Sequence, residues 1–168
     1  MAVMSVFITN LGKYNEGELV GKWIDLPIDD EDLNKAFKEI GINEEYEEYF
    51  ITDYESEYGI KIDEYENIYK LNEKLQELEN EDSDKICAML ESGWYSDIDE
   101  VIDNVGYCDL IKGITAEQYE EDLIADGYPE FNKLMDSWLG GYITVDYEEM
   151  AKDDDYIVET SKGVLYKI

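Results

Sequence analysis

Histidine and arginine are both missing from this sequence of 168 residues. All 13 basic residues are lysine, against 44 aspartates and glutamates, which gives a formal net charge of −31. Without histidine the chain has no imidazole base, no Ser-His or Cys-His nucleophile and no zinc site of the Cys/His kind. Without arginine the carboxylates lack the bidentate partner that neutralises them inside folds, so we expect most of them to face water.

Cysteines and long apolar runs are scarce. Cys87 and Cys108 form no CxxC motif, and we expect reduced thiols in a cytosolic protein rather than a disulfide. The first ten residues have no basic segment and only a short, alternating apolar part, which argues against a signal peptide. No apolar run approaches the roughly 18 residues that span a membrane.

The composition nevertheless predicts a folded protein. The sequence is 44% hydrophobic and contains 15 Tyr, 4 Phe and 3 Trp, which is too apolar for an acidic disordered tail. A folded body with this surplus of acid repels phosphate. We therefore expect no direct binding to DNA, RNA or anionic lipid.

The first third, residues 1–61, is predicted to form a mixed α/β domain with a small antiparallel sheet. The segment 12–17 contains two glycines and an asparagine, as expected for a turn or loop, and Gly41 is placed to stop a helix. The expected elements are strands over 6–11, 19–28 and 47–54 and a helix from Asp29 or Asp30 to Ile40.

The middle, residues 62–106, is predicted to be a small helical bundle. A capping-box-like start at Asp63 precedes a stripe at three- and four-residue spacing, formed by Ile68, Leu71, Leu75 and Leu78. Two shorter helices are expected over 83–92, ended by Gly93, and over 96–104.

The last third, residues 107–168, is predicted to be mixed α/β again. Thr115 to Gln118 forms a capping box that opens a helix to about Asp126, and Pro129 suits the first position of a second helix that ends at Gly140. Strands are expected over 142–145, 156–159 and 164–168, the last two joined by a turn at Gly163. The fold class is therefore α+β.

Clusters of acidic residues recur along the whole chain instead of gathering at one place. Carboxylate catalysis needs two acids in unlike environments, and nothing in the sequence singles out such a pair. No segment has the glycine and glutamate spacing of a calcium loop. We expect no enzyme activity, no cofactor and no metal site, and each cluster alone is interpreted as a solvated face.

The total charge needs a further explanation. Small soluble domains carry a net charge of about 2 to 8, and a larger excess destabilises the fold through self-repulsion. Duplex DNA carries about one charge per 1.7 Å, so 31 charges correspond to roughly 50 Å, or about 15 base pairs. Carboxylates fixed where phosphates would lie could compete for a DNA-binding groove. This comparison suggests a decoy for DNA.

Two segments carry a resemblance to a known family. The run from Val6 to Trp23, with Asn-Leu-Gly-Lys-Tyr-Asn-Glu-Gly-Glu-Leu at residues 10–19, and the acidic stretch from Glu44 to Glu55 resemble the antirestriction protein ArdA family. Over residues 60–168 the similarity is one of general character. We interpret residues 10–19 themselves as a fold determinant, a loop that closes the first sheet.

The resemblance implies a DNA mimic carried by mobile elements or phage, acting in the cytoplasm of a bacterial host. It implies an elongated chain of three small domains in a row, which dimerises through the C-terminal domain into a long curved body. Members of the family inhibit type I restriction-modification enzymes by filling the DNA site of their methyltransferase core. The resemblance implies no catalysis and no cofactor.

The decoy hypothesis assigns function to outward-facing acids, each expected to contribute little alone. The apolar residues Trp138, Tyr142, Ile143 and Tyr147 are candidates for the dimer interface, although a core role is equally expected for them. The candidate phosphate surrogates are Asp29, Asp30, Glu44, Glu45, Glu47, Glu48, Asp53, Glu55, Glu66, Glu73, Glu77, Asp97, Asp99, Asp103, Glu120, Glu121 and Asp126.

Other functions fit the same charge. A chaperone of basic proteins would use the acids without needing them at fixed positions. A salt-adapted structural protein would have no tight partner. An inhibitor of a different DNA-binding enzyme would share the mimicry but not the target.

Overall fold

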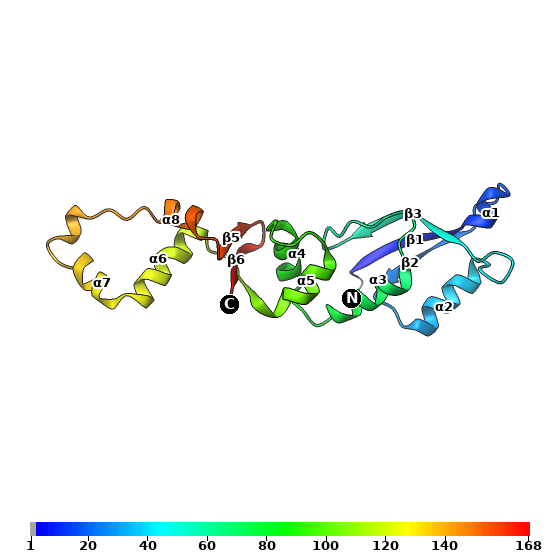
Figure 1. Ribbon diagram of the computed structural model, residues 1–168, viewed down its shortest axis with the longest axis horizontal. Coiled ribbons are helices and arrows are strands. Elements are labelled where there is room, and N and C mark those ends of the chain that lie inside the picture. Colours follow the sequence, from blue (N-terminus) through cyan, green and yellow to red (C-terminus); the bar gives the residue numbers. More distant parts are fainter. Residues whose placement is uncertain (1–2) are drawn as a thin grey trace. The chain divides into compact units, whose positions relative to one another are not determined.

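The computed structural model describes residues 3–168, which form a mixed α+β fold with eight α-helices and two three-stranded antiparallel sheets (Figure 1). The chain divides into two compact units. The first takes in the chain through Ser83 together with Asp97–Ile102, and the second consists of Asp84–Ser96 and Asp103–Ile168. The predicted α+β class is confirmed, while the division into three domains stays a prediction.

The sheet of the first unit has the order β2-β1-β3, and both neighbours run antiparallel to the central strand. β1 spans Met4–Asn10, β2 spans Gly21–Leu26 and β3 spans Tyr49–Ser56. Met4, Val6 and Ile8 alternate along β1 and are almost fully buried, as expected for a strand with one face on the core. The three predicted strands are confirmed with shifts of one to two residues at most ends.

The predicted helix after the second strand is also confirmed. α2 spans Asp30–Glu39, and its buried residues Leu33, Ala36 and Phe37 recur at helical spacing. Gly41 follows with a φ of +81°, a conformation that favours glycine and ends the helix. The helix therefore begins and ends where the sequence indicates.

The segment predicted as a loop over residues 12–17 is partly helical. α1 spans Leu11–Asn15, so the prediction of a loop is wrong for these residues. The reason is a side-chain cap: Asn10 Oδ1 accepts a hydrogen bond from Lys13 N at 3.0 Å. The glycine-rich part that remains non-helical includes Gly17, which has a φ of +86°.

The helix predicted to begin near Asp63 begins later, at Ile68. α3 spans Ile68–Glu77 and is capped by Asn67, whose side chain accepts a hydrogen bond from Lys70 N. The Glu64 carbonyl accepts a hydrogen bond from the Ile51 amide of β3 at 2.7 Å, which ties this segment to the sheet instead of to a helix. The buried face of α3 confirms the predicted apolar stripe, because Ile68, Leu71, Leu75 and the cap residue Leu78 are all buried.

Two further helices follow α3 in the sequence. α4 spans Ser83–Glu91, and Gly93 beyond it has a φ of +76°. α5 spans Ile98–Asn104, starting two residues after the predicted position, and a 3-10 helix over Val105–Tyr107 follows it. Both predicted helices are confirmed.

The sheet of the second unit has the order β4-β6-β5. β4 spans Cys108–Ile111, β5 spans Ile157–Thr160 and β6 spans Gly163–Lys167. The hairpin of β5 and β6 was predicted, but β4 was not. Gly163 has a φ of +137°, and a Cβ atom there would lie 2.3 Å from the Ile111 carbonyl oxygen, so glycine is required at this turn.

Three helices lie between β4 and β5 in the chain. α6 spans Ala116–Gly127 with Thr115 as its cap, α7 spans Pro129–Met135 and α8 spans Tyr147–Asp153. The predicted starts of α6 and α7 are confirmed, whereas α8 was not predicted.

Two predictions in this segment are wrong. The second helix ends at Met135 instead of Gly140, because the chain turns back so closely that a Cβ on Gly140 would lie 1.7 Å from the Met135 carbonyl oxygen. Residues 142–145 form no strand, because Gly140–Tyr142 is a 3-10 helix and Asp146 caps α8 by accepting from Glu149 N at 3.0 Å.

Among residues 3–168, no helix is both long and apolar enough to cross a membrane. Cys87 and Cys108 are not joined in a disulfide.

Candidate functional site

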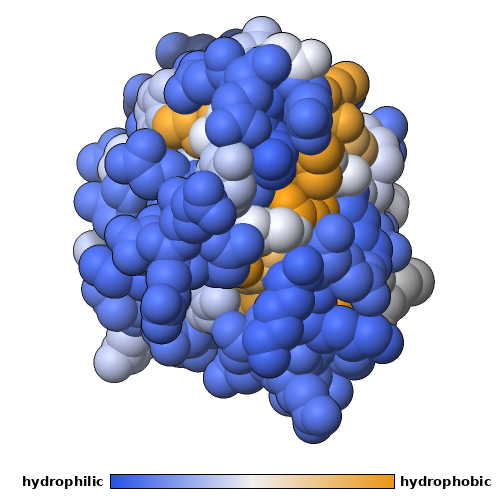
Figure 2. Space-filling view, turned by 90° about the vertical axis from the view of Figure 1, so that its right-hand side faces the viewer, coloured by the Kyte–Doolittle hydropathy of each residue, from blue (hydrophilic) through white to orange (hydrophobic). Residues whose placement is uncertain are grey.

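Exposed carboxylates cover both units, above buried apolar side chains. Figure 2 shows the face of the first unit around α1 and α2, where hydrophilic residues cover most of the surface and leave a narrow hydrophobic strip. Fifteen of the seventeen candidate acids are exposed, Glu66 is half-buried and Glu120 is buried. The exposed ones are Asp29, Asp30, Glu44, Glu45, Glu47, Glu48, Asp53, Glu55, Glu73, Glu77, Asp97, Asp99, Asp103, Glu121 and Asp126.

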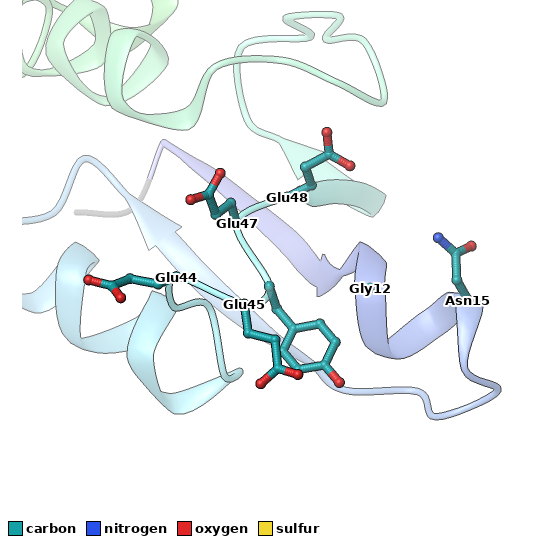
Figure 3. A pocket seen from close by; sticks show the side chains of 7 residues that line it. Gly12, Asn15, Glu44, Glu45, Glu47 and Glu48 are labelled. Atoms are coloured by element: carbon teal, nitrogen blue, oxygen red, sulfur yellow. The ribbon is translucent and has the colours of Figure 1, made fainter.

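One dense group lies between α2 and β3, on residues 44–48, which we call the acid loop. Its glutamates Glu44, Glu45, Glu47 and Glu48 are exposed and point in different directions around a shallow hollow (Figure 3). Within residues 3–168 none of these four carboxylates forms a hydrogen bond or ion pair. Four uncompensated charges so close together repel one another, so the loop needs support from elsewhere.

A second group of acids lies at the start of α2. Asp29 is the cap residue and Asp30 opens the first turn. Glu31 and Asp32 belong to the same acidic run and are also exposed, but they are not among the seventeen candidates. Acids at a helix N-terminus are favourable because the helix dipole places partial positive charge there. The run Asp-Asp-Glu-Asp was the signal that could have identified all four.

Lysines pair with acids inside and outside the candidate set. In the first unit Lys74 Nζ lies 2.8 Å from Asp99 Oδ2, which partly compensates the charge of this candidate. Other lysines pair with acids outside the candidate set: Lys22 with Glu39 in the first unit, and Lys112 and Lys162 with Asp84 in the second. These partners lower the pKa of Glu39 and of Asp84 below their ordinary values.

Glu120 differs from the other candidates because it is only 3% exposed. Among residues 3–168 its Oε1 atom has no hydrogen-bond partner, and burial together with the nearby Asp154 raises the pKa of the Glu120 carboxyl. A carboxyl withdrawn from the surface cannot serve as a phosphate surrogate. We therefore leave Glu120 out of the acidic surface.

The residues predicted for a dimer interface differ in exposure. Trp138 and Tyr142 are 78% and 83% exposed, and their rings form an edge-to-face pair with centroids 6.3 Å apart. Ile143 and Tyr147 are half-buried. An apolar hollow of the second unit is lined by Ile124, Tyr128, Phe131, Val145 and Met150.

The acidic surface contains no preformed cation cage. Among residues 3–168 no group of three or more Cys, Asp or Glu side chains is arranged to hold a metal ion. What these carboxylates can do chemically is attract and orient cationic side chains of a partner.

No curated protein matches the sequence. The model of the family described as Antirestriction protein (ArdA) matches residues 6–166, nearly the whole sequence, well beyond the segments that carried the resemblance. This chain therefore belongs to the ArdA antirestriction protein family, whose members are inhibitors that counteract restriction-modification enzymes.

Proposed function

We propose that this protein inhibits type I restriction-modification enzymes by mimicking B-form DNA and occupying the DNA site of their methyltransferase core. The observation that carries the proposal is the display of exposed carboxylates on ordered helices, strands and the acid loop, above a buried apolar core. Rigid anions compete with phosphates because the lysines and arginines of a DNA site recognise charge and spacing.

The protein acts as a homodimer in this proposal, joined through its C-terminal part. The support is the exposed Trp138 and Tyr142 and the apolar hollow around Phe131, which together leave much apolar surface in contact with water. A second copy would cover this surface and double the length of the mimic. Three small domains in each chain also remain part of the proposal.

A competition experiment tests the mechanism. A type I methyltransferase core, duplex DNA carrying its recognition site, and this protein are titrated at several salt concentrations. We expect stoichiometric displacement of DNA, with an affinity that falls steeply as salt rises. DNA that stays bound at low salt, where charge-driven competition is strongest, would overturn the choice of target and favour a different DNA-binding enzyme.

A matched pair of variants separates mimicry from a chaperone of basic proteins. One variant replaces the four acid-loop glutamates by glutamine. The other neutralises four exposed acids outside the candidate set and so has the same net charge; these are Glu117, Asp122, Glu130 and Asp136. Mimicry predicts a larger loss of affinity for the acid-loop variant, whereas a chaperone that is indifferent to position predicts equal losses.

A further inference from the structure

The acid loop has little regular structure of its own. It lies between the end of α2 and the start of β3, and a local turn holds its beginning: Asn43 Oδ1 accepts hydrogen bonds from the amides of Glu45 and Tyr46 at 2.8 and 3.1 Å. Its other end is tied to α1, because the Leu11 amide donates to the Glu48 carbonyl at 3.0 Å. The backbone of the loop is thus attached to the segment Asn10–Glu16, which we call the N-terminal motif.

The centre of the loop is attached to the same motif by one side chain, Tyr46. Its hydroxyl donates to Glu16 Oε1 at 2.8 Å and accepts from Lys13 Nζ at 3.2 Å. The Lys13 ammonium also lies 4.5 Å from the centroid of the Tyr46 ring and 3.1 Å from Glu16 Oε2. The hydrogen bonds from Tyr46 and Lys13 lower the pKa of Glu16, so this carboxylate stays charged.

Gly12 makes room for this contact. An added Cβ on Gly12 would lie 2.3 Å from the nearest carbon of the Tyr46 ring, so any larger residue at position 12 displaces the ring. Gly12 lies within α1, where alanine is the better helix former. Glycine at this position is therefore explained by the approach of the ring and not by the needs of the helix.

Asn10 fixes the motif to the body of the unit. Besides capping α1, its buried side chain donates from Nδ2 to the Ile40 carbonyl at 3.1 Å, at the end of α2. Ile40 immediately precedes the turn that leads into the acid loop. One asparagine therefore sets both the helix that carries Gly12 and Lys13 and the point at which the loop departs.

We infer that the segment Asn10–Glu16 is a positioning element for the acid loop, in which Gly12, Lys13 and Glu16 hold Tyr46 and so fix the directions of the neighbouring glutamates. The inference rests on the proposed function, and it assigns to the motif a role in recognition without contact with the target. Fixed carboxylates lose less conformational entropy on binding than mobile ones, so a held loop binds more tightly.

The test uses the full chain and three single variants. Gly12→Ala pushes the ring away while favouring α1, Tyr46→Ala removes the ring, and Tyr14→Ala is the matched control. Tyr14 lies on the same helix, is exposed and contacts Phe50 with ring centroids 5.2 Å apart, but among residues 3–168 its side chain forms no hydrogen bond with the acid loop. Each variant is measured with and without the four acid-loop glutamates changed to glutamine.

Amide hydrogen exchange measures the loop without any target. In Gly12→Ala and Tyr46→Ala we expect the Leu11, Glu45 and Tyr46 amides to exchange about tenfold faster, with no change in Tyr14→Ala. The double variant Gly12→Ala with Tyr46→Ala should match Tyr46→Ala alone, because the added methyl group no longer meets a ring. Unchanged exchange in Gly12→Ala would overturn the inference.

Competition against DNA on the methyltransferase core measures the functional consequence. We expect Gly12→Ala to weaken binding about fivefold, and the four glutamine substitutions to cost less affinity in that background than in the native one. Gly12→Ala could instead speed amide exchange in the loop, leave the affinity for the target unchanged, and leave the cost of the four glutamine substitutions as large as in the native chain. That result would overturn the inference, because the position of the loop would then not affect binding. If the native chain displaces no DNA at all, the proposed function itself fails, which is a different result.

Discussion

The first unit and the helical segment of the second unit bury their apolar side chains to very different degrees. In the first unit all three strands, α2 and α3 contribute side chains to a core that includes Ile8, Leu33 and Leu75. Between Lys112 and Tyr156 in the second unit, Glu120 is the one buried residue. The first unit therefore has a core of its own, whereas helices α6 to α8 leave their apolar side chains partly or fully exposed.

The largest expected effect is the difference in unfolding free energy between two leucine substitutions, one in each region. Leu75→Ala opens a cavity in the core of the first unit and should lower the free energy of unfolding of that unit by about 3 kcal/mol. Leu134→Ala removes the same atoms from an exposed position on α7 and should cost less than about 0.5 kcal/mol in the monomer. Denaturant titrations followed by hydrogen exchange measure both, and equal costs would contradict the comparison.

A charge in the apolar hollow tests what covers the helices. Phe131→Asp should weaken self-association about a hundredfold, about 2.7 kcal/mol, because the hollow can no longer be buried without desolvating a carboxylate. Sedimentation equilibrium measures the dimer, and the competition assay should lose affinity in parallel. Leu19→Asp is the control, since Leu19 belongs to the first unit and is 72% exposed. A native chain that is monomeric at high concentration would refute the dimer.

Glu120 gives a smaller, pH-dependent effect in the same helices. Its raised pKa means that the folded protein holds the proton more tightly than the unfolded chain, so its contribution to stability falls as pH rises from the unfolded pKa through the folded one. Glu120→Gln should therefore raise the free energy of unfolding by about 1 kcal/mol at pH 7 and leave it unchanged at low pH. Thermal unfolding at pH 4 and pH 7 checks this; an equal gain at both would exclude titration as the cause.

Single acids on the surface should have the smallest effects. Glu45→Gln removes an unpaired charge and should weaken target binding less than about threefold, while Asp99→Asn removes a charge that Lys74 already compensates and should do less still. Salt-dependent competition compares the two variants. A loss of more than about tenfold for either would indicate a specific contact in place of a distributed field.

The helix ends and the tight turn that depend on neighbouring residues were predicted from the sequence. As expected, α2 begins after Asp29 and ends before Gly41, Thr115 caps α6, and Gly163 lies in the turn between β5 and β6. β4 was missed because its four residues pair with a strand about 50 residues later, and nothing in Cys-Asp-Leu-Ile alone requires that partner. The start of α3 was misplaced because the Glu64 carbonyl accepts a hydrogen bond from β3, a contact that the local sequence does not show.

The sequence identified acids that are exposed but not how they are arranged in space. The acid clusters identified most of the exposed carboxylates, because acids without arginine partners stay in water. Glu120 was included because it stands beside Glu121 and Asp122 in the sequence, and its burial comes from tertiary packing around α6 that this local pattern does not show. The contact of Tyr46 with Gly12 joins residues 34 positions apart and leaves no local pattern.

The boundary between the two units has a consequence for how such a gene can change. The chain crosses from one unit to the other after Ser83, after Ser96 and again after Ile102, so no single position separates the two in the sequence. After one crossover between related genes at any of these points, at least one unit would contain segments from two different genes. The side chains that pack between those segments would then come from different sequences. We therefore expect the units to be inherited together, and their diversity to arise by substitution at exposed acids more readily than by exchange of whole modules.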